Sequence, residues 1–299
     1  MSDEIWVATG SEFVPPPKEK VRVWRTNDLT EEEKRKPYAK YYYRHLNPPD
    51  PEMVKAMEKP CDPSKIIWPE QINDLLKPGY LDVEIGWCEM PNGGGFIANL
   101  NKMPGVTANM IYWWFTWFTL NDLRYKIWYR PSHIGHYISP ETRKAILDPK
   151  SRIPQDTLWG RTHYAVEDVG MGGPELIAIH FKSPEDLGFD MNRFKQPNVS
   201  ALVGGYGDEM MLQDPKAPRG CAVMCHFIRD VPRGVEWRTR FWLGYRLQNR
   251  KADFCVPPGE KVPGNAIKGL ALHNVHEFAN YKVLIPEIYK ELEGRIFED

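Results

Sequence analysis

The stretch from which the rest of this chain can be interpreted is Gly264-Asn-Ala-Ile-Lys-Gly-Leu-Ala-Leu-His-Asn-Val-His-Glu-Phe278. Its pattern predicts a helix whose apolar residues pack against the body of the protein. Residues four apart lie on one helical face, with roughly 5–6 Å between their Cβ atoms. His273 and Glu277 have this spacing, and an imidazole and a carboxylate so placed can bind one divalent metal ion.

Two candidate ligands lie upstream of this helix. They are His133, at the end of Ile127-Trp-Tyr-Arg-Pro-Ser-His133, and Glu167, in Thr162-His-Tyr-Ala-Val-Glu167. Buried His and Glu side chains need partners, and a metal ion supplies them. If these side chains meet His273 and Glu277 in space, the protein is a metalloenzyme, with zinc as the expected ion.

Other interpretations of these residues stay open. His/Glu pairs at this spacing also occur on solvated helix faces, where they bind nothing. His276 lies on nearly the same face as His273, and His136 follows His133 by three residues in a segment where a structural role is equally plausible. His163 shares a strand face with Glu167, so it competes with His133 as a ligand or supports one from behind.

Composition excludes several classes of protein. The 299 residues carry 39 basic and 40 acidic side chains, intermixed, so no nucleic-acid partner is expected. The N-terminus lacks a basic region followed by an apolar one, and the longest apolar run, 110–120, is too short to span a bilayer. The five cysteines are scattered. We therefore expect a cytoplasmic protein with reduced thiols and no membrane contact.

The chain is expected to form an N-terminal extension or small subdomain over residues 1–78, packed on a catalytic domain over residues 79–299. Residues 1–60 are rich in proline and charge, and Thr30 is a candidate helix cap. Alternation over 79–90 predicts a strand, followed by a turn at Pro91-Asn-Gly-Gly-Gly95.

Aromatic residues dominate 106–120 and predict a buried helix capped by Thr107. Further patterns predict a strand over 123–129 and two strands within 155–181 that are joined at Gly170-Met-Gly-Gly-Pro174. A loop-rich segment is expected over 193–207, followed by strands over 222–230 and 234–245. A final helix begins at Asn265, and Pro286 ends or restarts it. Antiparallel strands with internal and C-terminal helices indicate an α+β fold.

Three other kinds of site are unsupported. Cys221 and Cys225 lie on one strand face but about 13 Å apart, too far for one tetrahedral ion. No Gly-x-Ser-x-Gly elbow is present. His276-Glu277 is not followed by the second histidine of a His-Glu-x-x-His motif.

Three segments together resemble one family. Arg124-Tyr-Lys-Ile-Trp-Tyr-Arg-Pro-Ser-His133, Gly160-Arg-Thr-His-Tyr-Ala-Val-Glu-Asp-Val-Gly170 and His273-Asn-Val-His-Glu-Phe278 resemble the 2,4-diacetylphloroglucinol hydrolase family, which also includes phloretin hydrolase. The order and spacing match from about Tyr80 to Tyr289, whereas 182–220 does not line up.

The resemblance implies a helix-grip fold of the Bet v 1/START-like kind, in which a curved antiparallel sheet wraps a long C-terminal helix. It also implies a zinc ion held by His133, Glu167, His273 and Glu277. Tyr125 matches a tyrosine that binds a substrate phenol, and His226 matches a histidine near the metal. Glu167 is in addition a candidate for moving protons.

The function so implied is zinc-dependent hydrolysis of the carbon–carbon bond between an acyl group and a phloroglucinol-type ring. A small aromatic ketone would be the partner, and a homodimer is an open option. One alternative is a non-catalytic helix-grip protein that binds a hydrophobic aromatic ligand. Another is a lyase or oxygenase that uses iron, since two His and one Glu suit iron(II).

Overall fold

The centre of the molecule is an eight-stranded antiparallel sheet with the strand order β1-β2-β8-β7-β6-β5-β4-β3. The computed structural model describes residues 16–24, 26–169, 173–212 and 220–298. The strands are β1 (Gly86–Glu89), β2 (Gly95–Pro104), β3 (His133–Ile138), β4 (Thr162–Glu167), β5 (Glu175–Phe181), β6 (Ala201–Met211), β7 (Gly220–Val231) and β8 (Gly234–Leu243), with a separate ribbon of β9 (Tyr245–Gln248) and β10 (Lys251–Phe254).

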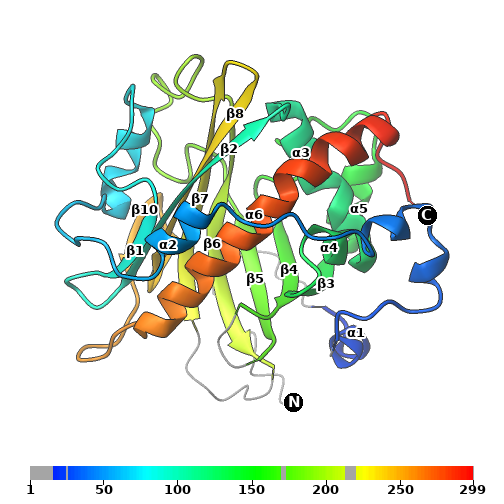
Figure 1. Ribbon diagram of the computed structural model, residues 1–299, viewed down its shortest axis with the longest axis horizontal. Helices are drawn as coiled ribbons and strands as arrows, with labels where there is room; N and C mark the ends of the chain where they lie inside the picture. Colours follow the sequence, from blue (N-terminus) through cyan, green and yellow to red (C-terminus); the bar gives the residue numbers. More distant parts are fainter. Residues whose placement is uncertain (1–15, 25, 170–172, 213–219, 299) are drawn as a thin grey trace.

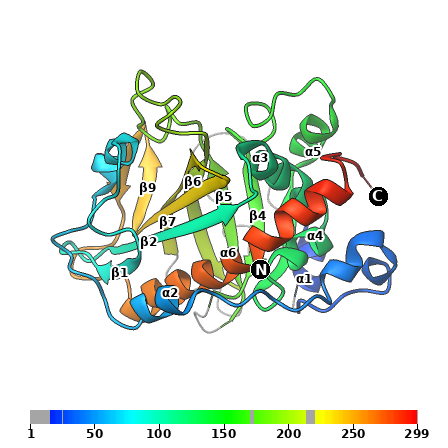
Figure 2. The same ribbon diagram turned by 45° about the horizontal axis from the view of Figure 1, so that its top comes forward.

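The long helix α6 (Gly264–Glu291) crosses one face of this sheet diagonally (Figures 1 and 2). Three shorter helices gather around its C-terminal half (Figure 1). These are α3 (Ala108–Trp117), α4 (Asp122–Trp128) and α5 (Pro140–Leu147). The remaining helical segments are α1 (Lys18–Val23), η2 (Glu33–Arg35), η3 (Pro37–Tyr41), α2 (Pro51–Ala56), η4 (Pro69–Leu76) and η5 (Phe118–Leu120). The mixed α+β architecture with a large antiparallel sheet and a C-terminal helix is as predicted.

The first half of α6 packs on the sheet through residues at helical spacing. Ile267, Ala271 and Val275 are buried against Ile97 on β2 and Phe241 on β8. This apolar face, repeating every three or four residues, is what makes the segment a helix that covers a sheet.

The helix does not end or restart at Pro286, contrary to the prediction; it continues to Glu291. A proline inside a helix removes one backbone hydrogen bond and crowds the preceding turn. Here the flanking residues Ile285 and Ile288 are fully buried in the main aromatic cluster. That burial holds the helical backbone on both sides of the proline.

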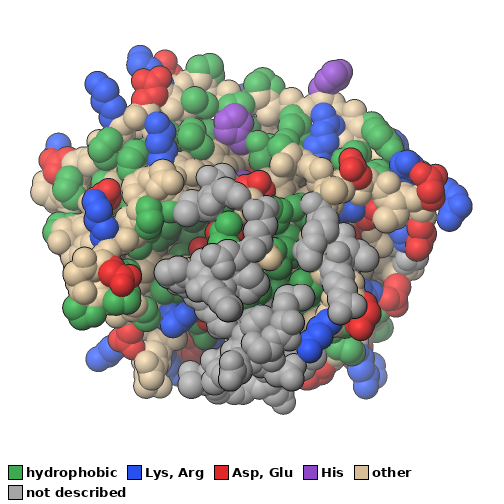
Figure 3. Space-filling view, turned by 90° about the horizontal axis from the view of Figure 1, so that it is seen from below, with side chains coloured by type: hydrophobic (Ala, Val, Ile, Leu, Met, Phe, Trp, Pro, Cys, Tyr) green, Lys and Arg blue, Asp and Glu red, His purple; other side chains and the backbone are tan. Residues whose placement is uncertain are grey.

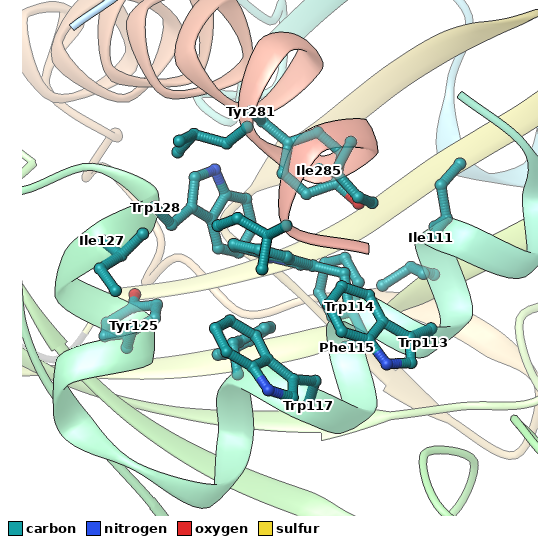
Figure 4. Packing of buried hydrophobic residues seen from close by; sticks show 14 of the residues in the cluster. Ile111, Trp113, Trp114, Phe115, Trp117, Tyr125, Ile127, Trp128, Tyr281 and Ile285 are labelled. Atoms are coloured by element: carbon teal, nitrogen blue, oxygen red, sulfur yellow. The ribbon is translucent and has the colours of Figure 1, made fainter. Parts of the chain in front are cut away.

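The aromatic run folds as predicted into α3, and the Oγ1 atom of Thr107 accepts a hydrogen bond from the Met110 amide at 3.3 Å. Its side chains meet those of α4 and α6 in a cluster drawn in Figure 4. Trp114, for example, lies edge-on to Trp128 of α4 and to Tyr281 of α6. The cluster fixes the three helices relative to one another, which matters because α4 and α6 both carry site residues.

Residues 123–129 were predicted to be a strand, and this prediction is wrong, because Asp122–Trp128 form the helix α4. The side chain of Asn121 caps the helix by accepting from the Leu123 amide at 2.9 Å. The alternation of polar and apolar residues was misleading because the polar ones are buried too. Arg124 donates to the backbone carbonyls of Trp117 and Phe297, and Lys126 pairs with Glu33 at 3.0 Å.

Two strand boundaries also differ from the predictions. Only Gly86–Glu89 of the segment 79–90 is a strand, because Glu84 turns its carboxylate towards Arg238 and Arg240 instead of alternating across a sheet. The segment 193–207 is not loop-rich throughout, since β6 begins at Ala201. The hairpin between β4 and β5 forms as expected, although Gly170–Gly172 of its predicted turn lie outside the described residues.

The described N-terminal residues pack on the body of the protein rather than on one another. Tyr38 lies edge-on to Trp117, with ring centroids 5.5 Å apart, and Met57 is buried against α6. Ile72 and Leu75 cover the opposite face of the sheet beside Phe227. The hydroxyl of Thr30 accepts from the Glu33 amide at 3.1 Å, but the N-cap position of η2 is occupied by Glu32 and not by Thr30 as predicted.

The surface agrees with the balanced charge of the sequence. On the face seen in Figure 3, acidic and basic side chains are interspersed, many of them near the rim. Within the part of the chain that the structure describes, no helix has the length and apolarity needed to cross a membrane.

Candidate metal centre and pocket

His273 and Glu277 lie on the same face of α6, as their four-residue spacing requires. The Nε2 atom of His273 is 3.6 Å from Oε2 of Glu277. Both side chains are buried, and both face the ends of β3 and β4.

His133 is the first residue of β3 and Glu167 the last of β4, and they are direct partners across these strands. The Nε2 atom of His133 is 3.6 Å from Oε2 of Glu167 and 3.6 Å from Oε2 of Glu277. The Nε2 atom of His273 is 3.1 Å from Oε2 of Glu167. The structure therefore brings together the four side chains proposed as ligands, from two strands and one helix.

The hydrogen bonding of His133 fixes what its other nitrogen can do. Its Nδ1 lies 3.1 Å from the carbonyl oxygen of Tyr125, which can only accept, so Nδ1 carries the proton. In the neutral ring, Nε2 then has a free lone pair, and it has no hydrogen-bond partner among the described residues. This lone pair faces the carboxylate oxygens of Glu167 and Glu277, and a cation placed between them would stabilise the arrangement.

The charges in the centre lead to the same requirement. Burial disfavours the charged form of His273, but Glu277 and Glu167 outweigh it and raise the pKa of His273 to about 10. Burial also opposes ionisation of Glu277, yet His273 and His133 lower its pKa to about 2. A proton on His273 balances the carboxylates in part, and a divalent ion would replace it. Two imidazoles and two carboxylates are a donor set that zinc accepts.

Two asparagines support Glu277 from behind. Nδ2 of Asn274 donates to Oε1 of Glu277 at 3.1 Å, and Oδ1 of Asn274 accepts from Nδ2 of Asn99 on β2 at 2.7 Å. Both side chains are fully buried. This chain leaves Oε2 of Glu277 free to face the two histidines. We did not identify either residue from the sequence, although an asparagine within an apolar helix face is a usable signal.

A pocket lined mainly by apolar groups opens onto three of the four side chains, Glu167, His273 and Glu277. On one side of the centre the lining is aromatic, with Phe115, Phe118, Trp128 and Phe181. The lining towards the start of α6 is aliphatic, with Ile177, Ala222, Leu243, Ala266 and Leu270. An apolar pocket with a few convergent polar groups is typical of small-molecule sites.

Tyr125 lies flat against His133, with ring centroids 4.1 Å apart and an interplanar angle of 2°. Its hydroxyl interacts with Glu167, and it lines the pocket. Burial, followed by the charges of Glu167 and Glu277, raises the pKa of Tyr125 well above its ordinary value. The phenol therefore remains protonated and can donate a hydrogen bond.

His226 lies on β7 and also lines the pocket. Its Nδ1 accepts from the indole Nε1 of Trp237 at 3.1 Å and lies 2.9 Å from the hydroxyl of Thr239. An indole N–H can only donate, so the proton of neutral His226 is on Nε2. Burial lowers the pKa of His226 to about 4, with Glu277 opposing the shift, so the ring is neutral near pH 7.

Three histidines that the sequence offered as alternative ligands lie outside the group of four. His136 lines the pocket, and burial holds its pKa well below the ordinary value. His163 packs behind His136, with ring centroids 5.3 Å apart, and its nitrogens have no hydrogen-bond partner among the described residues. His276 is half-buried beside Tyr129. None of them belongs to the cluster whose ligand atoms lie within 4.8 Å of one another, which contains His133, His273 and Glu277.

Comparison with known proteins agrees with the resemblance noted in the sequence. Residues 67–290 match the family model for the DAPG hydrolase PhiG domain. The chain is 34% identical to a phloretin hydrolase from Eubacterium ramulus over 268 residues, which cover 88% of this chain and 93% of that protein.

Two further relatives are 2,4-diacetylphloroglucinol hydrolases, from a Pseudomonas species and from Pseudomonas protegens. Each is 27% identical over 275 residues, covering 86% of this chain and 88% or 84% of the relative. These matches cover most of the chain, and they show that it belongs to the DAPG hydrolase family.

Proposed function

We propose that this protein is a zinc-dependent hydrolase that cleaves the carbon–carbon bond between an acyl group and a phloroglucinol-type ring. The observation that carries the proposal is the free Nε2 lone pair of His133, which faces two carboxylates beside His273. Family membership adds the reaction class, because the relatives are named as hydrolases of phloretin and of 2,4-diacetylphloroglucinol.

The proposed ligands are His133, Glu167, His273 and Glu277. When bound there, zinc supplies a Lewis acid that polarises a ketone and lowers the pKa of a bound water. In the overall reaction one water is consumed, and the bond between the ring carbon and the carbonyl carbon breaks. The acyl carbon gains a hydroxyl and leaves as a carboxylic acid, while the ring carbon gains a hydrogen.

The ring is a reasonable leaving group because an acylphloroglucinol can tautomerise. A proton moves from a ring hydroxyl to the ring carbon that bears the acyl group, and the compound then behaves as a β-diketone. On cleavage the ring leaves as a stabilised phenolate. The protein has to hold the ring hydroxyls, take a proton from the attacking water and return one to the ring oxygen.

Three side chains suit these tasks. Glu167 is an ionised carboxylate beside the Tyr125 hydroxyl, and we assign it the acceptance and return of the proton. Tyr125 stays protonated and donates to a ring oxygen. Neutral His226 presents Nε2–H, so we assign it the stabilisation of the departing phenolate rather than proton delivery, since losing that proton would leave an imidazolate.

We also propose the helix-grip assignment for the fold. A long C-terminal helix lies across an antiparallel sheet, and a pocket separates them, which supports this assignment. A cytoplasmic location is consistent with the five free cysteines. The division of the chain at residues 78 and 79 remains a prediction.

The test is elemental analysis of protein purified without oxygen, followed by incubation with phloretin and with diacetylphloroglucinol. We expect stoichiometric zinc and release of an acid and a deacylated ring from at least one compound. Iron in place of zinc would contradict the zinc assignment. Absence of both metal and products would contradict the whole proposal and favour the non-catalytic binding protein.

Substitution tests the ligand set. Glu277→Ala should weaken zinc binding by more than the roughly 10- to 100-fold that loss of a supporting residue costs. His276→Ala is the matched control, because it removes an imidazole from the same turn of α6 but from outside the cluster. Equal zinc contents in the two variants would show that the ligand set is wrong.

A further inference from the structure

One polar side chain in the pocket has no part in the proposed mechanism. Glu209 on β6 lines the same cavity as the metal centre. It is paired across the sheet with Ile177 on β5 and with Gly220 on β7. Its neighbours along the wall include Ala222 and Leu243, so a carboxyl group is present in an otherwise aliphatic part of the lining.

The carboxyl of Glu209 has no hydrogen bond or ion pair with any residue in the described ranges. Unpaired polar groups in apolar surroundings cost free energy, so they are rare without a function. Burial, followed by the charges of Glu167 and Asp208, raises the pKa of Glu209 to about 7. The carboxyl is therefore available to a ligand in the cavity.

The backbone beside Glu209 leaves room for this carboxyl. A Cβ added to Gly220, its partner on β7, would overlap Oε2 of Glu209. Any other residue at position 220 would push the carboxylate out of its present position. The side chain of Glu209 is half-buried at this point of the cavity wall.

The position of Glu209 relative to the metal centre sets what can reach it. Glu167 pairs with Glu175, and Glu175 pairs with Met211, two residues from Glu209. With strands about 4.8 Å apart and a rise of about 3.4 Å per residue, the Cα atoms of Glu167 and Glu209 are about 12 Å apart. An acetyl group held at the centre is too short to approach Glu209, whereas an arylpropanoyl group is long enough.

The two parts of the lining suggest the direction in which the substrate lies. The aromatic part, beside Tyr125 and His226, offers donors for the ring hydroxyls of the phloroglucinol. The aliphatic part, towards Leu270, suits an acyl chain that ends at Glu209.

We infer that Glu209 is a specificity residue that accepts a hydrogen bond from a phenolic hydroxyl at the far end of the acyl group. The preferred substrates are then phloroglucinol ketones whose acyl chain carries a terminal hydroxyphenyl ring. This inference rests on the proposed function and adds the acyl group that the pocket selects.

The experiment uses the zinc-loaded enzyme and three compounds. These are phloretin, its analogue without the hydroxyl on the propanoyl-linked ring, and monoacetylphloroglucinol. The readout is the ratio of kcat/KM for phloretin to that for the deoxy analogue. At pH 8, where the Glu209 carboxyl is mostly ionised, we expect the unmodified protein to favour phloretin about 10- to 100-fold, the range for a hydrogen bond to a charged group.

Three variants locate the preference. Glu209→Leu should bring the ratio close to one, mainly through a higher KM for phloretin, and Glu209→Gln should keep part of the preference because its amide oxygen still accepts. Glu185→Leu is the control, since Glu185 is exposed, lies outside the pocket lining and forms an ion pair with the surface residue Arg250. It should retain the original ratio. A general loss of folding or activity lowers both rates and leaves the ratio unchanged.

The acetyl compound separates the two proposals. If the protein cleaves monoacetylphloroglucinol but has equal kcat/KM for the two dihydrochalcones, the inference on Glu209 is wrong and the proposed reaction stands. A preference that persists in Glu209→Leu also overturns the inference. If none of the three compounds is cleaved by the zinc-loaded protein, both proposals fail.

Discussion

The side chain of Asn274 shows how a residue without metal-binding chemistry can shape a metal centre. It holds Oε1 of Glu277, so the other oxygen is the one that faces His133 and His273. Without this hydrogen bond, the carboxylate of Glu277 could rotate about the last bond of its side chain and take several orientations. Residues in this position commonly change metal affinity by about 10- to 100-fold.

We therefore expect Asn274→Ala to lower zinc affinity about tenfold or more, with the ligands all present. The measurement is a competition titration against a coloured chelator. Asn280→Ala is the matched control on the same helix, because Asn280 donates to the Trp128 carbonyl at 2.7 Å and touches no ligand. Equal losses of zinc affinity in both variants would mean that the stability of α6 as a whole controls zinc binding, and not the hydrogen bond from Asn274 to Glu277.

The candidate ligands were accessible from the sequence because His and Glu are conspicuous within apolar segments. His273 and Glu277 follow from helical spacing alone, whereas His133 and Glu167 also needed the family resemblance. Asn274 was missed because asparagine is not among the usual zinc ligands, and Glu209 was missed because it lies in the segment 182–220 that did not line up with the family. Their roles come from what lies across the fold, and no local pattern contains that information.

At the scale of helices and strands, the predictions were correct where apolar residues recur at a regular spacing in the sequence. β7 and β8 alternate over many residues, and α3 has a capping threonine before an aromatic run. β6 was hidden by Gly204, Gly205 and Gly207, which have no side chains to show alternation. The helix α4 was hidden because its charged residues are buried with partners, which no local rule anticipates.

The cap of α4 gives a prediction at this scale. Asn121→Ala removes the side chain that accepts from the Leu123 amide, and we expect the free energy of unfolding to fall by about 1 kcal/mol. Urea denaturation followed by tryptophan fluorescence measures it. Asn192→Ala, at an exposed position outside any helix or strand, should change it by less than about 0.5 kcal/mol. A loss at Asn121 no larger than this would show that tertiary packing alone specifies α4.

At the scale of the whole molecule, the chain before the sheet covers both of its faces. Met57 packs against α6 on one face, and Leu75 packs beside Phe227 on the other. Arg238 and Arg240 on β8 are fully buried beneath this second covering, and both pair with Glu84. The opposed charges lower the pKa of Glu84 against the effect of its burial.

Glu84 is therefore expected to matter far more than a surface carboxylate. Glu84→Gln leaves two buried arginines without a negative partner, and we expect a loss of about 3–5 kcal/mol in the free energy of unfolding. Glu185→Gln breaks an exposed ion pair with Arg250 and should cost less than about 1 kcal/mol. Similar denaturation midpoints for the two variants would contradict this account of how the N-terminal segment is held.

Tyr125 meets His133 twice, once through its carbonyl and once through the face of its ring. Redesign of substrate range would naturally begin at this tyrosine, because its hydroxyl reaches into the cavity. Any replacement that shifts the local backbone or removes the flat ring will also disturb His133, which we propose as a zinc ligand. Variant libraries at Tyr125 should be screened for metal content before they are screened for new activities. Positions in the pocket wall far from the proposed ligands can be changed to broaden the substrate range with less effect on metal binding.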